Sequence, residues 1–262
     1  MLAGRLIRFV LGTVGFAIFL AMLELAAWSS GVSEASFPRA STIVKRTVLV
    51  LGDSSFRGAV ADTLRAAAVG FAIACVIAIP CGIILAQSRR LFRALRVVLE
   101  LLRPIPAIAL IPPALLVLGA GTKMKVSLIA YAVSWILLYN TLYAVHDVDT
   151  TLRLTADVYR LGRLRKARSV ILPAALPFIL TGVRIAATAA FLVAVAVELI
   201  AGGTNGLGQW LGTYRDSGSH RDYVFAGAFV AGFIGLGLNV GLSALETKLF
   251  PWRASVEGRS TE

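Results

Sequence analysis

The stretch that decides the fold is Thr150–Pro177, TTLRLTADVYRLGRLRKARSVILPAALP, which is strongly basic and ends its first part in Ile171-Leu172-Pro173. The stretch is compatible with a helix and lies between long apolar runs. A cationic block in that position lies outside the bilayer, on the cytoplasmic side. A basic helical segment between membrane spans indicates where a membrane subunit meets a soluble partner.

The composition of the whole chain points to lipid as its solvent. The 262 residues are 58% hydrophobic and only 15% charged, whereas soluble domains carry roughly 25% charged residues. The mean hydropathy is +0.81. The net charge of +12 does not indicate nucleic-acid binding, because the basic residues fall between apolar runs instead of lining one face of a folded domain.

The residues that usually form metal, redox or catalytic sites are scarce. Cys75 and Cys81 lie in one apolar run, about 9 Å apart along a helix, which is too far for a disulfide. The histidines, His146 and His220, are distant from both cysteines in the sequence. We therefore expect no metal ligands and no catalytic residues, and an embedded enzyme is not indicated.

Apolar runs long enough to cross a hydrocarbon core of about 30 Å predict an all-α, polytopic six-helix transmembrane bundle with a cytoplasmic helix at about 150–172. The first run carries Glu24, and we interpret it as a retained span because it is long and lacks a small-x-small cleavage site. The runs are Phe9–Trp28, Ala66–Ala86, Pro104–Thr122, Val126–Val145, Ile179–Ala201 and Tyr223–Leu245.

Basic residues concentrate on one side of these runs, and the positive-inside rule then places both termini in the cytoplasm. The cytoplasmic set comprises Arg5, Arg8, Arg89, Arg90, Arg93, Arg96, Arg153, Arg160, Arg163, Arg165, Lys166, Arg168, Lys248, Arg253 and Arg259. The opposite set comprises Arg39, Lys45, Arg46, Arg57, Lys123, Lys125, Arg215 and Arg221.

The runs divide the chain into a first transmembrane helix (1–28), an outer elbow (29–58), a core with five spans (59–252) and a cytoplasmic tail (253–262). In the elbow, Pro38 and Gly52–Ser55 bracket a short helix over Thr42–Leu51, which we expect along the outer membrane surface. The clustered prolines at 104–113 are expected to kink their span. The glycines of the last span, including Gly237 and Gly241, predict close helix contacts.

A series of short motifs runs through residues 37–252 in a fixed order. The motifs are Thr63-Leu64-Arg65, Ile79-Pro80-Cys81-Gly82, Arg103-Pro104-Ile105-Pro106, Gly119-Ala120-Gly121, Asn140-Thr141-Leu142, Val170–Pro177, Thr181–Ala186, Glu198–Ala201, Gly206-Leu207-Gly208 and Asp222–Gly227. Each motif is weak alone. The ordered series resembles the membrane permease subunit of type I ABC importers, in particular the nitrate, sulfonate and taurine branch.

This resemblance implies a type I ABC importer permease fold and a pathway for a small anionic solute such as nitrate, a sulfonate or taurine. It also implies two ATPase subunits, a second permease subunit in a homo- or heterodimer, and a periplasmic or extracellular solute-binding protein. The implied location is the bacterial inner membrane. ATP and Mg would be bound by the ATPase, because this sequence lacks a Walker A loop and is expected to bind no cofactor itself.

The family's cytoplasmic signature begins with Glu-Ala-Ala, continues to a glycine and ends in hydrophobic-Leu-Pro, and here only its end is intact. Aligned without gaps from Pro173, the acid falls on Leu154 and the glycine on Arg160. Aligned on Gly162 instead, the acid falls on Ala156. Loss of the acid leaves open a second interpretation, a scaffold subunit that pairs with a different permease carrying the intact signature.

The resemblance implies that this segment docks on the ATPase. We expect Asp157 near the N-terminal end of the helix and a row of arginines facing an acidic groove. The candidate coupling residues are Thr155, Ala156, Asp157, Arg160, Gly162, Arg163, Arg165, Leu172 and Pro173.

Polar residues inside spans are functional candidates by default. Arg184 is expected to snorkel, and Glu198 to make a packing or gating hydrogen bond because it would repel an anion. Arg103 is expected to pair with Glu100 three residues earlier. Asn140 faces either the pathway or a neighbouring helix. The candidate pathway or gating residues are Glu198, Asn140, Arg103 and Arg184.

Overall fold

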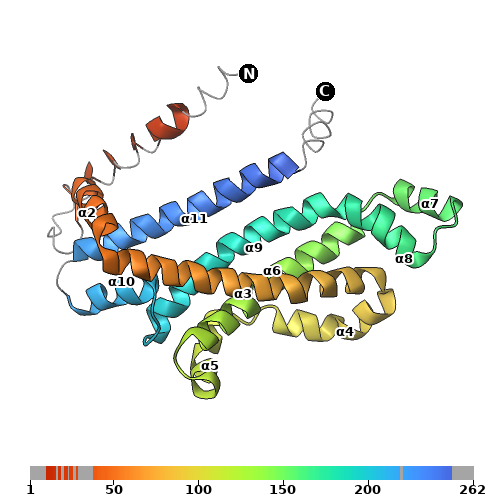
Figure 1. Ribbon diagram of the computed structural model, residues 1–262, viewed down its shortest axis with the longest axis horizontal. Coiled ribbons are helices and arrows are strands. Elements are labelled where there is room, and N and C mark those ends of the chain that lie inside the picture. The colour runs from red at the N-terminus through yellow and green to blue at the C-terminus, as the bar shows by residue number, and fades with distance from the viewer. Residues whose placement is uncertain are drawn as a thin grey trace.

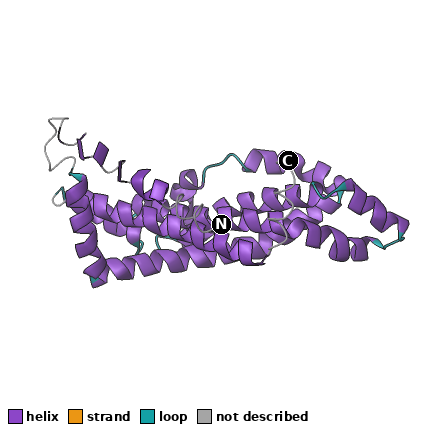
Figure 2. Cartoon of the chain, turned by 90° about the horizontal axis from the view of Figure 1, so that it is seen from above, coloured by secondary structure: helices purple, strands orange, loops and turns teal. Residues whose placement is uncertain are grey.

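The computed structural model describes residues 38–218 and 221–249, together with short stretches between 10 and 28. In this part of the chain the ordered elements are all helical, and the long helices run lengthwise through an elongated bundle (Figures 1 and 2). The predicted span Phe9–Trp28 lies outside the continuously described residues, and the predicted tail 253–262 lies outside the described residues altogether.

The helices follow one another with short connections. They are α2 (Ala40–Gly52), α3 (Ser54–Gln87), α4 (Arg89–Leu102), the 3-10 turn η1 (Ala107–Leu110), α5 (Ile111–Leu118), α6 (Thr122–His146), α7 (Thr150–Val158), α8 (Arg163–Lys166), the π-helical turn η2 (Ala167–Ile171), α9 (Leu172–Ala201), α10 (Leu207–Asp216) and α11 (Arg221–Leu249).

Four continuous helical stretches are long and apolar enough to cross a membrane: Ser54–Gln87, Thr122–His146, Arg163–Ala201 and Arg221–Lys248. Four of the predicted spans lie within them. The stretch Arg163–Ala201 has 39 residues and is about 58 Å long at ~1.5 Å per residue, well beyond a hydrocarbon core of ~30 Å. This stretch therefore joins a crossing helix to a segment that projects from the membrane.

The crossing predicted at 104–122 is not one helix, and this part of the prediction was wrong. The chain bends by 78° between Arg89–Leu102 and Ala107–Leu118. Pro104 and Pro106 lack amide N–H groups and cannot continue the hydrogen-bond ladder of α4. Pro112 and Pro113 are tolerated because they lie in the first turn of α5. If α4 and α5 are counted as one broken span, the described part holds up to five helical segments long and apolar enough to cross a membrane. Most of α4 precedes the predicted span.

The core lies where α3, α6 and α9 pack together, and glycines allow their close approach. A Cβ on Gly70 of α3 would lie 2.7 Å from Cγ2 of Ile129, and one on Gly182 of α9 would lie 2.6 Å from Cβ of Asn140. The glycines of α11 behave differently. Gly227 touches Leu211 and Trp210, whereas Gly237 and Gly241 face open space within the described residues. The contact predicted for that pair is therefore not made by the described residues.

The helix predicted in the elbow is α2, and it packs against the beginning of α11. Arg46 forms an ion pair with Asp222, and its guanidinium lies 4.5 Å from the ring centroid of Tyr223.

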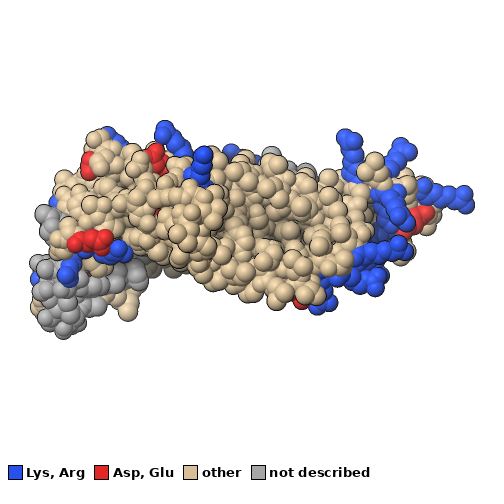
Figure 3. All heavy atoms as spheres, turned by 90° about the horizontal axis from the view of Figure 1, so that it is seen from below, with Lys and Arg blue, Asp and Glu red and all other residues tan. Residues whose placement is uncertain are grey.

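The two ends of the bundle differ in charge. On the face shown in Figure 3, Lys and Arg side chains gather at the end that carries α7 and α8, beyond a band nearly free of charge. We call this the basic end; it comprises Arg89, Arg90, Arg93, Arg153, Arg160, Arg163, Arg165, Lys166 and Arg168.

Candidate functional site

The segment expected as a single helix over 150–172 consists of two helices with a turn between them. α7 ends at Val158, the chain turns through residues 159–162, and α8 leads through the π-helical turn into α9. The two helices project from the bundle at its basic end (Figure 1). The expectation of one continuous helix was wrong, because the backbone at Arg160 leaves the right-handed helical conformation.

Arg160 has φ +52° and is the one non-glycine residue in the described part with positive φ. Leu161 N–H donates to the Ala156 carbonyl at 3.0 Å, and Arg160 N–H donates to the Asp157 carbonyl at 2.9 Å. These two bonds make a Schellman C-cap, in which the left-handed position normally holds glycine. The gap-free alignment puts the signature's glycine at Arg160, so the backbone supports that alignment and places Leu154 at the position of the signature acid.

The other coupling candidates fall on both sides of this turn. Asp157 lies in the last turn of α7, not near its N-terminal end as expected, and both of its carboxylate oxygens accept from Lys166 Nζ at 2.7 Å. Ala156 is buried, and the Thr155 hydroxyl donates to the Thr151 carbonyl. Gly162 precedes α8, Arg163 and Arg165 are exposed on α8, and Leu172 and Pro173 begin α9.

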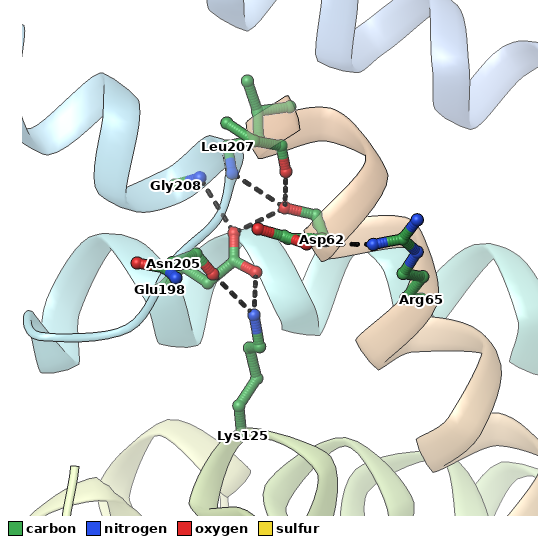
Figure 4. Close-up of polar contacts among 9 residues, drawn as sticks. Asp62, Arg65, Lys125, Glu198, Asn205, Leu207 and Gly208 are labelled. Carbon is green, nitrogen blue, oxygen red and sulfur yellow. Dashed lines mark hydrogen bonds and ion pairs between the residues drawn. The ribbon is translucent and has the colours of Figure 1, made fainter. Parts of the chain in front are cut away.

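At the opposite end of the bundle, Glu198 of α9 is completely buried in a polar cluster (Figure 4). Its Oε1 accepts from Lys125 Nζ at 2.7 Å, and its Oε2 accepts from Thr63 Oγ1 at 2.8 Å and from Gly208 N–H at 2.9 Å. Lys125 is only 3% exposed and donates a second bond to the Asn205 carbonyl at 2.7 Å. Every charge in this cluster is thus paired and hydrogen-bonded, as a buried charge requires.

The glycine-rich turn before α10 is shaped around this carboxylate. Gly206 has φ +148°, and a side chain there would collide with the Glu198 carboxylate. Leu207 N–H donates to Thr63 Oγ1 at 2.8 Å, which ties the start of α10 to α3. This turn therefore joins α3, α6, α9 and α10 at one point.

Sequence reasoning missed Lys125, which it assigned to the outer aqueous side. A signal was present in the sequence. Lys125 lies three residues after α6 begins, and Glu198 lies three residues before α9 ends. Opposite charges at the same depth of two neighbouring spans indicate a buried pair. The helix α10 was also missed, because it is short and amphipathic and falls in a stretch that resembles a loop.

The remaining candidates lie nearer the middle of the bundle or its basic end. Arg103 does not pair with Glu100, which is bound by Arg96 at 2.7 Å; the Arg103 guanidinium lies 4.3 Å from the ring centroid of Tyr139. Asn140 Nδ2 donates to the Ile136 carbonyl at 2.8 Å within α6. Arg103 and Asn140 line one open cavity of about 500 Å³.

Arg184 does more than snorkel, because it links α9 to α11. Its guanidinium lies 3.4 Å from Glu246 Oε2, and the Thr181 hydroxyl donates to Glu246 Oε1 at 2.8 Å. The structure thus separates the four pathway candidates into a buried cluster opposite the basic end, an open cavity and a helix-to-helix ion pair. Within the described residues, no group of three or more His, Cys, Asp or Glu side chains is placed to hold a metal ion.

Residues 78–253 match the family described as the binding-protein-dependent transport system inner membrane component. The chain belongs to this family. The permease is 34% identical to a putative ABC transporter permease protein of Methanocaldococcus jannaschii, over 78% of this chain and 76% of that one.

Two further relatives match over almost the whole chain. The taurine transport system permease protein TauC of Escherichia coli is 30% identical over 97% of this chain and 92% of its own. The nitrate import permease protein NrtB of Leptolyngbya laminosa is 28% identical over 95% and 91%. The permease is accordingly a transport subunit of an ABC importer of the nitrate, sulfonate and taurine type.

A solved structure shares the fold. The inward-facing MetNI methionine ABC transporter superposes with a TM-score of 0.65, at 19% identity, over 73% of this chain and 94% of that chain. The likeness supports the arrangement of the helices, and at this identity it carries no information about the solute.

Proposed function

We propose that the permease forms the translocation pathway of an ABC importer for a small anionic solute, nitrate-, sulfonate- or taurine-like, and is driven by a separate ATPase through α7 and α8. Two ATPase subunits would act on two permease subunits in the inner membrane, with the termini in the cytoplasm. A solute-binding protein would deliver solute at the end that carries α10. The names of the relatives and the charge difference between the two ends of the bundle support this arrangement.

The observation that best supports a coupling role is the exposed surface of the α7–α8 segment. Val158, Tyr159 and Leu164 are 80%, 76% and 83% exposed, although they lie at the charged end of the molecule. Exposed apolar side chains inside a polar rim are typical of a protein interface. The rim here is basic, which suits an acidic groove on a partner.

The same segment is built to transmit a displacement. The Schellman turn fixes the end of α7, and the ion pair between Asp157 and Lys166 closes the turn. Arg153 of α7 donates to the carbonyl of Val145 in the last turn of α6 and to the carbonyl of Val148 just after that helix. A displacement of α7 or α8 by the ATPase would therefore move α6 and α9 with them as a rigid body.

The test is co-purification of the ATPase with two matched variants. Leu164→Asp puts a charge into the proposed interface, and we expect it to reduce the ATPase yield at least about tenfold, since a buried unpaired charge costs several kcal/mol. Leu49→Asp is the control, because Leu49 is 62% exposed on α2 at the other end. Equal ATPase yields from the two variants would exclude α8 as the contact.

A second function is suggested by Leu154 at the position of the signature acid. In this alternative the permease is a degenerate, mainly structural partner in a heterodimer with an intact permease. The backbone at Arg160 argues against this alternative, because Arg160 adopts the left-handed conformation of the signature's glycine and the turn forms without that glycine. Intact mass measurement of the native complex decides the composition: a second permease mass supports the heterodimer, and a single permease mass removes it.

A further inference from the structure

Arg103 is an exposed cation on the side of the bundle, well away from the basic end, and it has no carboxylate partner in the described part of the chain. It follows the last residue of α4, which places it about 21 Å from the basic end at ~1.5 Å per residue. Among residues 38–218 and 221–249 no carboxylate pairs with it; Glu100, one turn earlier, is bound by Arg96. A guanidinium at membrane depth is costly unless it is paired, and such residues mark solute or ion paths.

The turn that carries Arg103 is held in place. The Tyr131 hydroxyl of α6 donates to the Leu102 carbonyl at 2.9 Å, at the point where Pro104 ends the helical ladder. The ring of Tyr139, which is 8% exposed, lies under the guanidinium. The stacking on Tyr139 orients the planar fork and leaves N–H donors of the guanidinium for another acceptor.

The cavity beside Arg103 offers more donors than acceptors. Trp135 lines it, and its indole Nε1 is buried with no hydrogen-bond partner in the described part of the chain. Asn140 uses one amide hydrogen on the Ile136 carbonyl, so its second hydrogen is available. No acidic side chain lines the cavity. The lining therefore suits an oxyanion, and it offers no carboxylate to an ammonium group or a metal cation.

We propose that this cavity is the solute-contact site of the pathway and that Arg103 binds the oxyanion end of the solute, a nitrate or sulfonate group. The inference rests on the proposed transport function and assigns the site within it. The planar guanidinium gives two parallel N–H···O bonds to such a group, which an ammonium cannot reproduce. A zwitterionic sulfonate binds through its sulfonate group alone, because the cavity holds no carboxylate for the amine.

The experiment measures binding by tryptophan fluorescence titration of the purified permease–ATPase complex with sodium nitrate, sodium methanesulfonate and taurine, at constant ionic strength with chloride as reference. We expect saturable binding of at least one of them to the wild type. Arg103→Gln should weaken it about tenfold or more, as expected for loss of hydrogen bonds to a charged group. The affinity of Arg103→Lys should lie between those of the wild type and Arg103→Gln. Trp135→Phe should lose the fluorescence change that comes from Trp135, and its affinity, measured by competition, should fall less than that of Arg103→Gln.

The control is Arg65→Gln, which makes the same charge change in a surface pair with Asp62 at the other end of the bundle. It should bind like the wild type. Wild-type affinity in Arg103→Gln, or no saturable binding by the wild type, overturns the assignment. Uptake into proteoliposomes separates the two proposals. Solute binding without ATP-driven uptake would contradict the proposed transport function but not the proposed binding site. ATP-driven uptake with an unchanged KM in Arg103→Gln would contradict the binding site alone.

Discussion

The replacement of Lys125 by Met is the most severe test of the polar cluster around Glu198, at the end of the bundle opposite the basic end. Met has nearly the same length as Lys and keeps the packing, so the change removes the charge that neutralises Glu198. Breaking a buried pair by removing one partner typically costs 3–5 kcal/mol. Glu198 would keep Thr63 Oγ1 and the Gly208 N–H as donors, so we expect the lower end, about 3 kcal/mol.

The assay is thermal unfolding of the purified permease complex. A loss of about 3 kcal/mol corresponds to a fall in Tm of about 6–12 °C for a chain of this size. Lys123→Met is the matched control, because Lys123 is exposed two residues earlier in the same helix. A Tm for Lys125→Met that equals the control would refute the reasoning.

Two double variants separate charge from hydrogen-bond direction. Lys125→Met with Glu198→Gln removes both charges, and the Gln carbonyl still accepts from Thr63 and Gly208; stability should return to within about 1 kcal/mol of the wild type. The charge swap Lys125→Glu with Glu198→Lys should not restore it. A lysine at 198 cannot accept the Gly208 N–H, which would then be buried and unsatisfied.

The remaining predictions concern backbone and packing. Arg160→Gly should raise the free energy of unfolding by about 0.5–1 kcal/mol and Tm slightly, because a non-glycine residue in the left-handed conformation costs about 1–2 kcal/mol and glycine recovers most of it. Arg165→Gly, inside α8, is the control and should lower Tm. A lower Tm for both variants would contradict the Schellman assignment. Gly70→Ala should destabilise by about 1–3 kcal/mol through overpacking against Ile129. A Cβ at Gly237 would have no described atom within 4 Å, so Gly237→Ala should leave the stability of the isolated chain near that of the wild type. Equal losses of stability in Gly70→Ala and Gly237→Ala would show that the helix contacts are misassigned.

The apolar spans were predictable because both of their environments favour the same residues. A helix such as α3 or α9 needs apolar side chains against lipid and against its neighbours, so its length appears in the sequence whatever it packs on. The break after α4 was foreshadowed by Pro104 and Pro106. The 78° bend and the separation into α4 and α5 were not, because one proline can kink a helix or end it.

The polar sites were less predictable because they depend on long-range contacts. Lys125 directly precedes an apolar run, where a lysine that snorkels and a lysine that is buried have the same local sequence. Thr63 and Glu198 are 135 residues apart in the chain, and no local pattern connects them. Arg160 is the converse case, since comparison with the signature marked its position and only the backbone showed that it has the conformation of glycine.

The most direct test of the whole account is ATP hydrolysis in proteoliposomes that contain the permease, its ATPase and its solute-binding protein. We predict that binding protein loaded with nitrate, methanesulfonate or taurine raises the hydrolysis rate and drives uptake, and that Leu164→Asp abolishes both. A hydrolysis rate that is the same with and without the permease, for every loaded binding protein, would contradict the claim that this chain couples solute movement to the ATPase.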